Sequence, residues 1–154
     1  MIIGDSSALI ALATIDRLDL LEKLFNEIYV PKAVFEEVTT SQKAQAKKLE
    51  TFLKDKVISI KGDTFNIGLG EGELEAMRLY KEMKADFLLI DDLRAKKFAR
   101  LNNINTIGTL GVMIFAKEKG YIDSIKKDLK KLEQSSIFIS SALIAKILKE
   151  VGES

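Results

Sequence analysis

Short apolar segments alternate with longer amphipathic segments along the whole chain. Unbroken apolar stretches at residues 1–4, 28–30 and 87–90 each stop at a polar or turn-forming residue, which is typical of short buried strands. Residues 57–60 and the pair at 106–107 predict two further strands. Because helical spacing of apolar residues separates these strands, the pattern predicts an α/β fold with a mainly parallel sheet.

The predicted helices fill most of the remaining chain. Pro31 suits the first turn of one helix, since that position needs no N–H donor. Thr109 is expected to cap another helix, which ends at Gly120. Residues 137–139 are expected to form an additional strand between the last two helices. The predicted helical segments are residues 8–12, 17–25, 32–38, 41–56, 71–84, 92–101, 109–120, 122–132 and 140–148.

Composition excludes much of the usual enzyme chemistry. The 154 residues fit one domain, and 24 basic against 23 acidic residues argue against nucleic-acid binding through bulk positive charge. The chain has no Cys and no His, which excludes disulfides, thiolate or imidazole metal sites, cysteine nucleophiles and Ser-His-Asp triads. No apolar run approaches the roughly 18 residues of a membrane span, and the N-terminus lacks the pattern of a signal peptide. We therefore expect a cytoplasmic protein with no membrane association.

Acidic residues follow two separate strands of the predicted sheet. Asp5 comes directly after the first strand, and Asp91 and Asp92 follow the strand at 87–90. Ligands of open parallel sheets bind beyond the carboxyl ends of the strands, so these side chains are expected to approach one another. The alternative for each is helix capping, which needs no further role.

The predicted helix at 32–38 carries two adjacent glutamates that lie on different faces of the helix. Glu37 shares its face with Val34, whereas Glu36 shares its face with Lys32 and can pair with it. Glu37 is therefore expected on the packed side and Glu36 in solvent. An acid on an apolar face is unfavourable unless it is paired or binds a cation, so Glu37 is the better functional candidate. A salt bridge or a slightly different helix phase is the alternative.

Three glutamates open the helix at 71–84. Glu73 shares its face with apolar residues such as Met77, whereas Glu75 has Arg78 as a local partner. Glu71 lies at the helix start, where the helix dipole favours any acid. Glu73 is therefore the preferred candidate.

The selected acids are suited to binding a divalent cation. Carboxylates gathered in one cleft repel one another, and a bound cation relieves that repulsion. Oxygen ligands without His or Cys favour Mg²⁺ or Mn²⁺, which can activate water and stabilise charge in phosphodiester hydrolysis. The candidates are Asp5, Glu37, Glu73, Asp91 and Asp92.

The order and spacing of several stretches resemble the PIN domain, the fold of VapC-type toxin ribonucleases, and most closely a branch of uncharacterised PIN-like proteins. The likeness covers residues 1–120 and extends over the whole chain. The resemblance implies a three-layer α/β/α sandwich formed by a single domain, residues 1–154, in which residues 121–154 are a helical extension. The matching stretches are IIGDSSALIAL, VPKAVFEEV, GEGELEAMRLY, FLLIDDLRAKKFARL and TIGTLGVMIFAKEKGYI.

The resemblance also implies roles for individual residues. Asp5, Glu37, Glu73 and Asp92 match the family's metal-binding acids, with Asp91 as the alternative to Asp92. Ser6 matches a small hydroxyl residue that supports the site. Two departures stand out: most members have Asp where this chain has Glu73, and a Thr where it has Ile90.

The function implied by the resemblance is a Mg²⁺- or Mn²⁺-dependent endoribonuclease that acts as the toxin of a toxin–antitoxin pair. Such toxins are typically homodimers inhibited by a small antitoxin protein. A catalytically inactive PIN-fold module that binds RNA or protein is the alternative. The candidate RNA contacts, with solubilising surface charge as their alternative role, are Arg94, Lys96, Lys97 and Arg100.

Two other classes fit the residues less well. A phosphoacceptor receiver domain needs its pair of acids after the first strand, whereas here the pair follows a later one. A P-loop needs a Lys-Ser/Thr after the glycines, and the segment containing Gly68, Gly70 and Gly72 continues instead into acids that repel phosphate.

Overall fold

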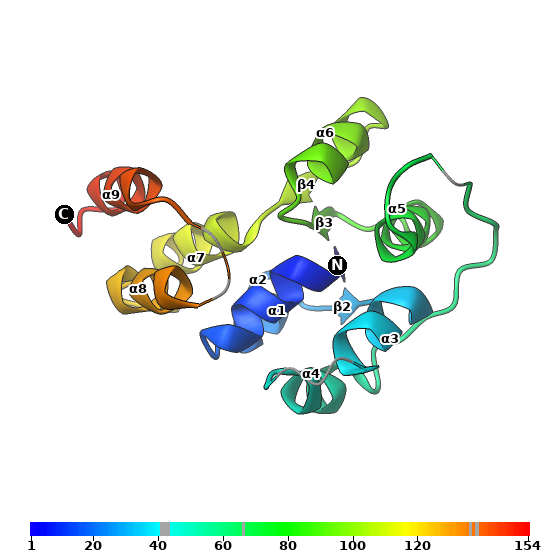
Figure 1. Ribbon diagram of the computed structural model, residues 1–154, viewed down its shortest axis with the longest axis horizontal. Helices are drawn as coiled ribbons and strands as arrows, with labels where there is room; N and C mark the ends of the chain where they lie inside the picture. Colours follow the sequence, from blue (N-terminus) through cyan, green and yellow to red (C-terminus); the bar gives the residue numbers. More distant parts are fainter. Residues whose placement is uncertain (41–43, 66, 136, 138) are drawn as a thin grey trace.

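The computed structural model consists of a small parallel sheet covered by helices on both faces (Figure 1). It describes residues 1–40, 44–65, 67–135, 137 and 139–154. The four strands follow the order β2-β1-β3-β4 and all neighbours are parallel. The strands are β1 (Ile2–Gly4), β2 (Ile28–Tyr29), β3 (Phe87–Leu89) and β4 (Thr106–Ile107).

Helices form the outer layers of the sandwich. In Figure 1, α1, α2 and α7 lie on one side of the sheet, and α3 and α5 lie on the other. The helices of the described chain are α1 (Ser6–Thr14), α2 (Asp19–Phe25), α3 (Lys32–Thr40), α4 (Ala46–Leu53), α5 (Glu71–Met83), α6 (Leu93–Leu101), α7 (Thr109–Glu118), α8 (Lys126–Gln134) and α9 (Ser141–Glu150).

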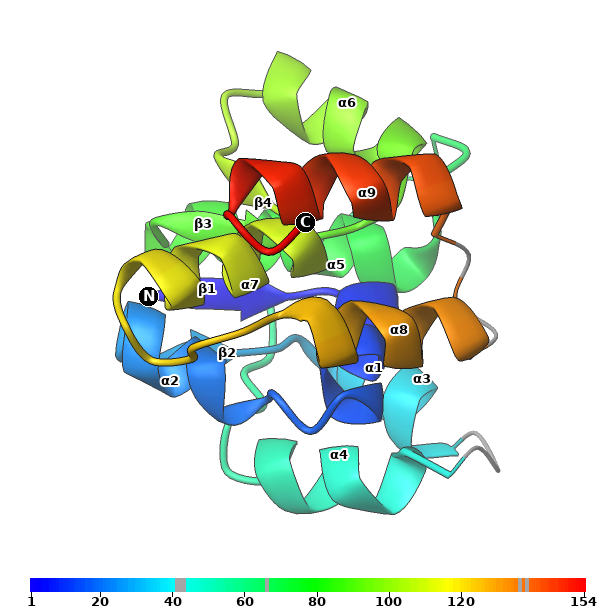
Figure 2. The same cartoon turned by 90° about the vertical axis from the view of Figure 1, so that its left-hand side faces the viewer.

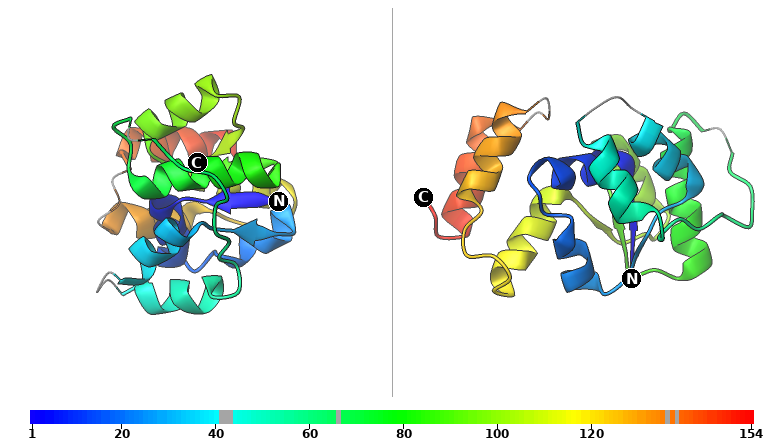
Figure 3. Two further views of the ribbon diagram at one scale, coloured as in Figure 1. Left: turned by 90° about the vertical axis from the view of Figure 1, so that its right-hand side faces the viewer. Right: turned by 90° about the horizontal axis from the view of Figure 1, so that it is seen from below.

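The two C-terminal helices add a further layer to the sandwich. Figure 2 shows α8 and α9 in front of α1 and α7, and the right panel of Figure 3 shows them beyond α7 at one end of the molecule. Leu129 of α8 and Ile147 of α9 belong to the same buried cluster as Ile2 of β1. These helices therefore share the core of the sheet and its covering helices.

The central strands β1 and β3 are apolar and largely buried. Ile2 and Ile3 of β1 and Leu88 of β3 are fully buried, as expected for a parallel sheet covered by helices. β1 pairs with both neighbours, with Ile2 opposite Ile28 on one side and opposite Phe87 on the other. The carboxyl ends of β1 and β3 consequently lie side by side.

The sequence-based prediction of a strand at 57–60 is wrong. Val57 forms a single parallel bridge with Val30, and the Ile58 N–H donates to the Val30 carbonyl at 2.9 Å. β2 has only two residues, so residues 57–60 can form a single bridge beside it and no continuous ladder. The chain then continues as the loop that precedes α5.

Several helix boundaries also differ from the prediction. Gly108, not Thr109, is the N-cap of α7. The helix expected at 122–132 begins only at Lys126, and Ile122 and Ile125 are buried ahead of it. The predicted strand at 137–139 and the first residues of the helix predicted at 41–56 include positions outside the described residues.

Candidate active site

An acidic pocket of about 450 Å³ lies where the carboxyl ends of β1 and β3 meet α3 and α5. It contains four of the five acids selected from the sequence. Asp5 follows β1, Glu37 comes from α3, Glu73 comes from the first turn of α5, and Asp92 precedes α6. The fold thus gathers side chains that are up to 87 positions apart in the sequence, the separation between Asp5 and Asp92.

Asp5 is the most deeply buried of these acids, with 3% of its surface exposed. It occupies the N-cap position of α1, but its side chain makes no capping hydrogen bond. Burial raises the pKa of Asp5 to about 7, against the lowering effect of the Ser6 N–H, and the negative charges of Glu73, Glu37 and Asp92 raise the pKa further. Capping therefore does not explain an aspartate at this position.

Glu37 is held in the pocket by the start of α1. The Ser6 Oγ donates to Glu37 Oε2 at 2.7 Å, and Ser6 itself is buried. The sequence analysis placed Glu37 on the packed side and Glu36 in solvent, but both are exposed and both line the pocket. The apolar face of α3 is narrower than expected, because only Val34 and Val38 are fully enclosed.

Gly72 allows α5 to approach Glu37 closely. A Cβ atom at position 72 would lie 2.9 Å from Glu37 Oε2 and 3.4 Å from Val34 Cγ2. Every other residue type would displace the carboxylate or separate the two helices. Gly72 therefore serves the close approach of α5 to α3, whereas a Cβ on Gly70 would meet only Glu73 of α5 itself.

The three glutamates of α5 are arranged differently from one another. Glu73 Oε1 accepts a hydrogen bond from the Gly70 N–H at 2.9 Å, which satisfies a donor at the helix start. Glu71 also lines the pocket. The expected pairing of Glu75 with Arg78 is wrong: Glu75 accepts from the Ala33 N–H of α3 at 3.2 Å, and Arg78 pairs with Glu82 at 2.6 Å.

Asp91 and Asp92 point to different sites. Asp92 Oδ1 caps α6 by accepting from the Ala95 N–H at 2.8 Å, and the residue lines the acidic pocket. Asp91 accepts from both the N–H and the Oγ1 of Thr109, at 2.7 and 2.5 Å, and lines a groove beside α7 instead. Asp91 thus holds the start of α7, which explains why Thr109 does not cap that helix itself.

The basic candidates on α6 divide between two faces of that helix. A Cβ atom on Gly68 would lie 2.9 Å from an Arg94 guanidinium nitrogen, so Arg94 packs against the loop before α5. Lys96 and Arg100 line the groove that contains Asp91, and Lys97 is exposed. Of the four, only Arg94 is fixed on the side of the loop that leads to the acidic pocket.

Three polar side chains of the pocket were not among the predicted site residues. Ser7 follows the buried start of α1, and Glu36 and Glu71 each adjoin or lie close to a selected glutamate. Glu36 does form the predicted pair with Lys32, at 3.8 Å, but this exposed contact leaves it at the pocket rim. The sequence analysis placed Glu36 in solvent, attributed Glu71 to the helix dipole and gave Ser7 no role. The available sequence signal was their proximity to the candidates Glu37, Glu73 and Ser6.

The acidic pocket fits a divalent cation by its donor chemistry, although the acids are not arranged as a ready-made site. All of its charged ligands are carboxylates, which suit hard cations such as Mg²⁺ and Mn²⁺. Within the described residues, no group of three acidic side chains is positioned to hold a metal ion. Glu37 and Glu73 instead use one oxygen each for hydrogen bonds to Ser6 and Gly70.

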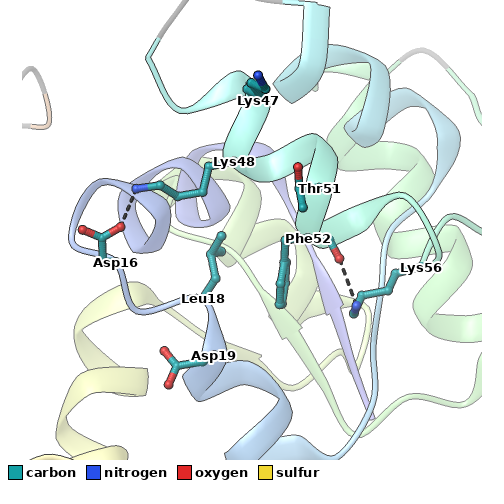
Figure 4. Close-up of a pocket in the computed structure, with 8 residues that line it drawn as sticks. All are labelled: Asp16, Leu18, Asp19, Lys47, Lys48, Thr51, Phe52 and Lys56. Atoms are coloured by element: carbon teal, nitrogen blue, oxygen red, sulfur yellow. Dashed lines mark hydrogen bonds and ion pairs between the residues drawn. The ribbon is translucent and has the colours of Figure 1, made fainter.

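A second pocket, of about 620 Å³, provides a contrast on another face of the molecule. This lysine pocket lies between the α1–α2 connection and α4, and contains Lys47, Lys48 and Lys56 (Figure 4). Acids lie close to two of its three lysines: Asp16 pairs with Lys48, and Glu22 lies 3.9 Å from Lys56 Nζ, which also donates to the Phe52 carbonyl at 2.9 Å. Both aspartates of this pocket therefore have a lysine partner, since Asp19 pairs with Lys23.

The family model DUF3368, described as a PIN domain, matches residues 1–153. The chain belongs to this PIN-domain family. A search of curated proteins found no significant match. Membership agrees with the all-parallel sheet between helical layers, and the match indicates a nuclease-type fold. No helix of the described chain is both long and apolar enough to span a membrane.

Proposed function

We propose that this protein is a divalent-cation-dependent endoribonuclease that hydrolyses RNA phosphodiester bonds at the acidic pocket. The observation that carries the proposal is Asp5, a buried carboxylate that caps nothing and faces Glu37, Glu73 and Asp92. A fold gains no stability from gathering like charges around a buried acid. Such an arrangement is characteristic of a site for a ligand of opposite charge.

Each side chain has a distinct part in this proposal. Asp5, Glu37, Glu73 and Asp92 would hold the cation, Mg²⁺ or Mn²⁺, and Ser6 would orient Glu37 through its 2.7 Å hydrogen bond. When bound, the cation supplies an activated water and neutralises charge that develops on the phosphodiester. Arg94, next to the pocket, is placed to attract a neighbouring phosphate of the strand.

The biological setting belongs to the same proposal. The resemblance to VapC-type proteins supports the toxin of a toxin–antitoxin pair, acting on RNA as a cytoplasmic homodimer and inhibited by a small antitoxin protein. PIN-family membership supports the nuclease part of this description. Co-purification of the chain with the product of an adjacent small gene would test the toxin part separately from the chemistry.

A second candidate is a PIN-fold binding module without catalytic activity. The observation in its favour is that Glu37 and Glu73 accept hydrogen bonds from Ser6 and Gly70, while no group of three acids in the described chain is positioned to hold a metal ion. Such a module would bind RNA or protein but would not respond to divalent cations.

The test is RNA cleavage by the purified chain with Mn²⁺, with Mg²⁺ and with chelator. We expect metal-dependent cleavage that Asp5→Asn abolishes and that Asp16→Asn leaves unchanged, because Asp16 lies in the lysine pocket away from the acidic pocket. Equal cleavage by the wild type and Asp5→Asn would indicate a contaminating nuclease. No cleavage, together with no cation binding by calorimetry, would establish the binding module instead.

A further inference from the structure

An apolar slot of about 330 Å³ lies beside the acidic pocket, between α5, α6 and the loop before α5. Two hydrophobic loop side chains border it in solvent: Phe65 is 79% exposed and Ile67 is 46% exposed. Large apolar side chains with this exposure in a loop mark a contact surface when they adjoin a cavity. The walls of the slot are formed by Leu74, Met77, Phe98 and Ile104.

Charged side chains lie at the rim of the slot. Arg78 and Lys81 line it from α5, against a single acid, Asp63. Arg78 is paired with Glu82, and Lys81 Nζ donates to the Asn102 carbonyl at 2.6 Å, so both cations are held at the rim. An apolar cavity with the Lys81 ammonium at its edge, hydrogen-bonded to a carbonyl and not to a carboxylate, matches the chemistry of a nucleobase attached to phosphate.

The slot and the acidic pocket are connected through one short segment. Ile67 borders the slot, Gly68 packs against Arg94, and Gly70 lies in the wall of the acidic pocket. α5 makes the same connection, since Glu73 lines the pocket and Leu74 lines the slot. Arg94 therefore lies against the segment that joins the two sites, where its guanidinium can reach a phosphate of a strand that occupies both.

We propose that this slot binds one unpaired base of the RNA strand whose phosphodiester lies at the acidic pocket, with Phe65 stacking on the base and Arg94 holding the intervening phosphate. This inference rests on the proposed function. It makes the enzyme selective for single-stranded RNA, because a base within a duplex is stacked and cannot enter a slot. A protein partner that inserts an apolar side chain is the competing occupant, and the experiment separates the two.

The experiment measures binding of a labelled single-stranded RNA of about ten nucleotides by fluorescence anisotropy, in chelator and at low salt. We expect Phe65→Ala to weaken binding roughly tenfold, since stacking on an aromatic ring contributes on this order, and Phe65→Trp to retain it. Tyr121→Ala is the matched control, because Tyr121 is 48% exposed and follows the far end of α7. Thermal melts check that each variant is folded.

A second arm changes the RNA instead of the protein. An abasic residue is placed at each position of the probe in turn. We expect one position at which the wild type loses affinity while Phe65→Ala loses nothing further, as required if the missing base and the missing ring contacted each other. A duplex of the same sequence is expected to bind more weakly than the single strand.

The outcomes separate this inference from the proposed function. If RNA binding depends on Phe65 but no metal-dependent cleavage occurs, the nuclease proposal is refuted and the base-binding slot is supported. If Phe65→Ala changes neither cleavage nor binding, the base-binding slot is refuted and the proposed nuclease is not. The exposed Phe65 and Ile67 would then be assigned to contact with a protein partner. Absence of RNA binding by the wild type would overturn the slot.

Discussion

The acidic pocket and the lysine pocket surround an aspartate in opposite ways: Asp5 is buried among other acids, whereas Asp16 is exposed beside lysines. In the lysine pocket, a hydrogen bond from Lys48 lowers the pKa of Asp16, and Lys131 lies 3.4 Å from the same carboxylate. In the acidic pocket, burial and three surrounding acids raise the pKa of Asp5. Pairing of an exposed aspartate with lysines, as for Asp16, is an ordinary surface arrangement that needs no function to explain it.

The difference is the reason that we propose the acidic pocket as the functional site. The lysine pocket is larger, about 620 Å³ against about 450 Å³, but every aspartate in it has a local cation: Asp16 has Lys48, and Asp19 has Lys23 at 3.0 Å. The acidic pocket lacks such compensation around Asp5. Size therefore does not identify the site, whereas uncompensated like charge does.

The largest expected effect follows from the pKa of Asp5. Since folding raises this pKa from 3.8 to about 7, the stability that the neutral carboxyl provides is complete below pH 4 and is lost as pH rises through 7. Without metal, Asp5→Asn should therefore stabilise the protein at pH 8 by roughly 3 kcal/mol and change little at pH 4. Urea unfolding at both pH values, in chelator, measures this.

Asp16→Asn is the control for that experiment, because it removes an aspartate whose pKa is lowered instead. It should give no stabilisation at pH 8. If Asp5→Asn were equally stable or less stable than the wild type at pH 8, Asp5 would not be an uncompensated charge, and the contrast between the two pockets would be lost.

Metal binding should reverse the pH effect. If a divalent cation binds the native acids only, a concentration of 100 times its Kd stabilises the fold by about 2.7 kcal/mol. We expect Mn²⁺ or Mg²⁺ to raise the Tm of the wild type and of Asp16→Asn, and to leave that of Asp5→Asn unchanged. Differential scanning fluorimetry at pH 8 tests this, and an equal rise in all three proteins would place the cation elsewhere.

The adjacent aspartates after β3 should separate into one structural and one functional residue. Asp91→Ala leaves the buried Thr109 without its two hydrogen bonds, so it should destabilise the protein by about 2 kcal/mol while the cation-induced Tm rise persists. Asp92→Ala removes the α6 cap, about 1 kcal/mol, and should diminish the cation response. The reverse pattern would make Asp91 the ligand.

Gly72→Ala tests the close approach of α5 to Glu37. The added methyl group would displace the Glu37 carboxylate from Ser6, while alanine favours the helix by up to about 1 kcal/mol. We therefore expect unchanged or slightly increased stability together with a weaker cation response. A variant that keeps the full cation response would show that Glu37 is not a ligand in its present position.

The smallest effect is expected in the lysine pocket. Lys48→Ala removes an exposed ion pair with Asp16 and should lower the unfolding free energy by less than about 1 kcal/mol. Cation binding and RNA cleavage should not change. A loss of cleavage in Lys48→Ala would indicate that RNA also reaches this face of the molecule.

Much of the fold was predictable because local patterns determine it. Strands at 1–4, 28–30, 87–90 and 106–107 were predicted from short apolar runs, and the parallel order of the sheet agrees with the alternation of strands and helices. The strand at 57–60 failed because pairing depends on the length of a neighbouring edge, which β2 does not provide. The helix expected at 122 began later, because buried anchors such as Ile125 resemble a helical stripe.

The sequence by itself determined which residue types are available for chemistry and on which strand ends they fall. Without His or Cys, only carboxylates remained for a metal-assisted reaction, and Asp5 and Asp92 follow strands that a parallel sheet brings together. Helix faces also distinguished Glu73 from Glu75, although the partner expected for Glu75 was wrong.

Only the tertiary structure decided how those carboxylates are used. It separated Asp91 from Asp92 through Thr109, placed Glu36 as well as Glu37 in the acidic pocket, and divided the basic residues of α6 between two faces. These outcomes depend on which atoms from distant segments meet, such as the Gly72 backbone and the Glu37 carboxylate. The periodicity of apolar residues describes one helix or strand at a time, so it cannot predict contacts between side chains of different elements.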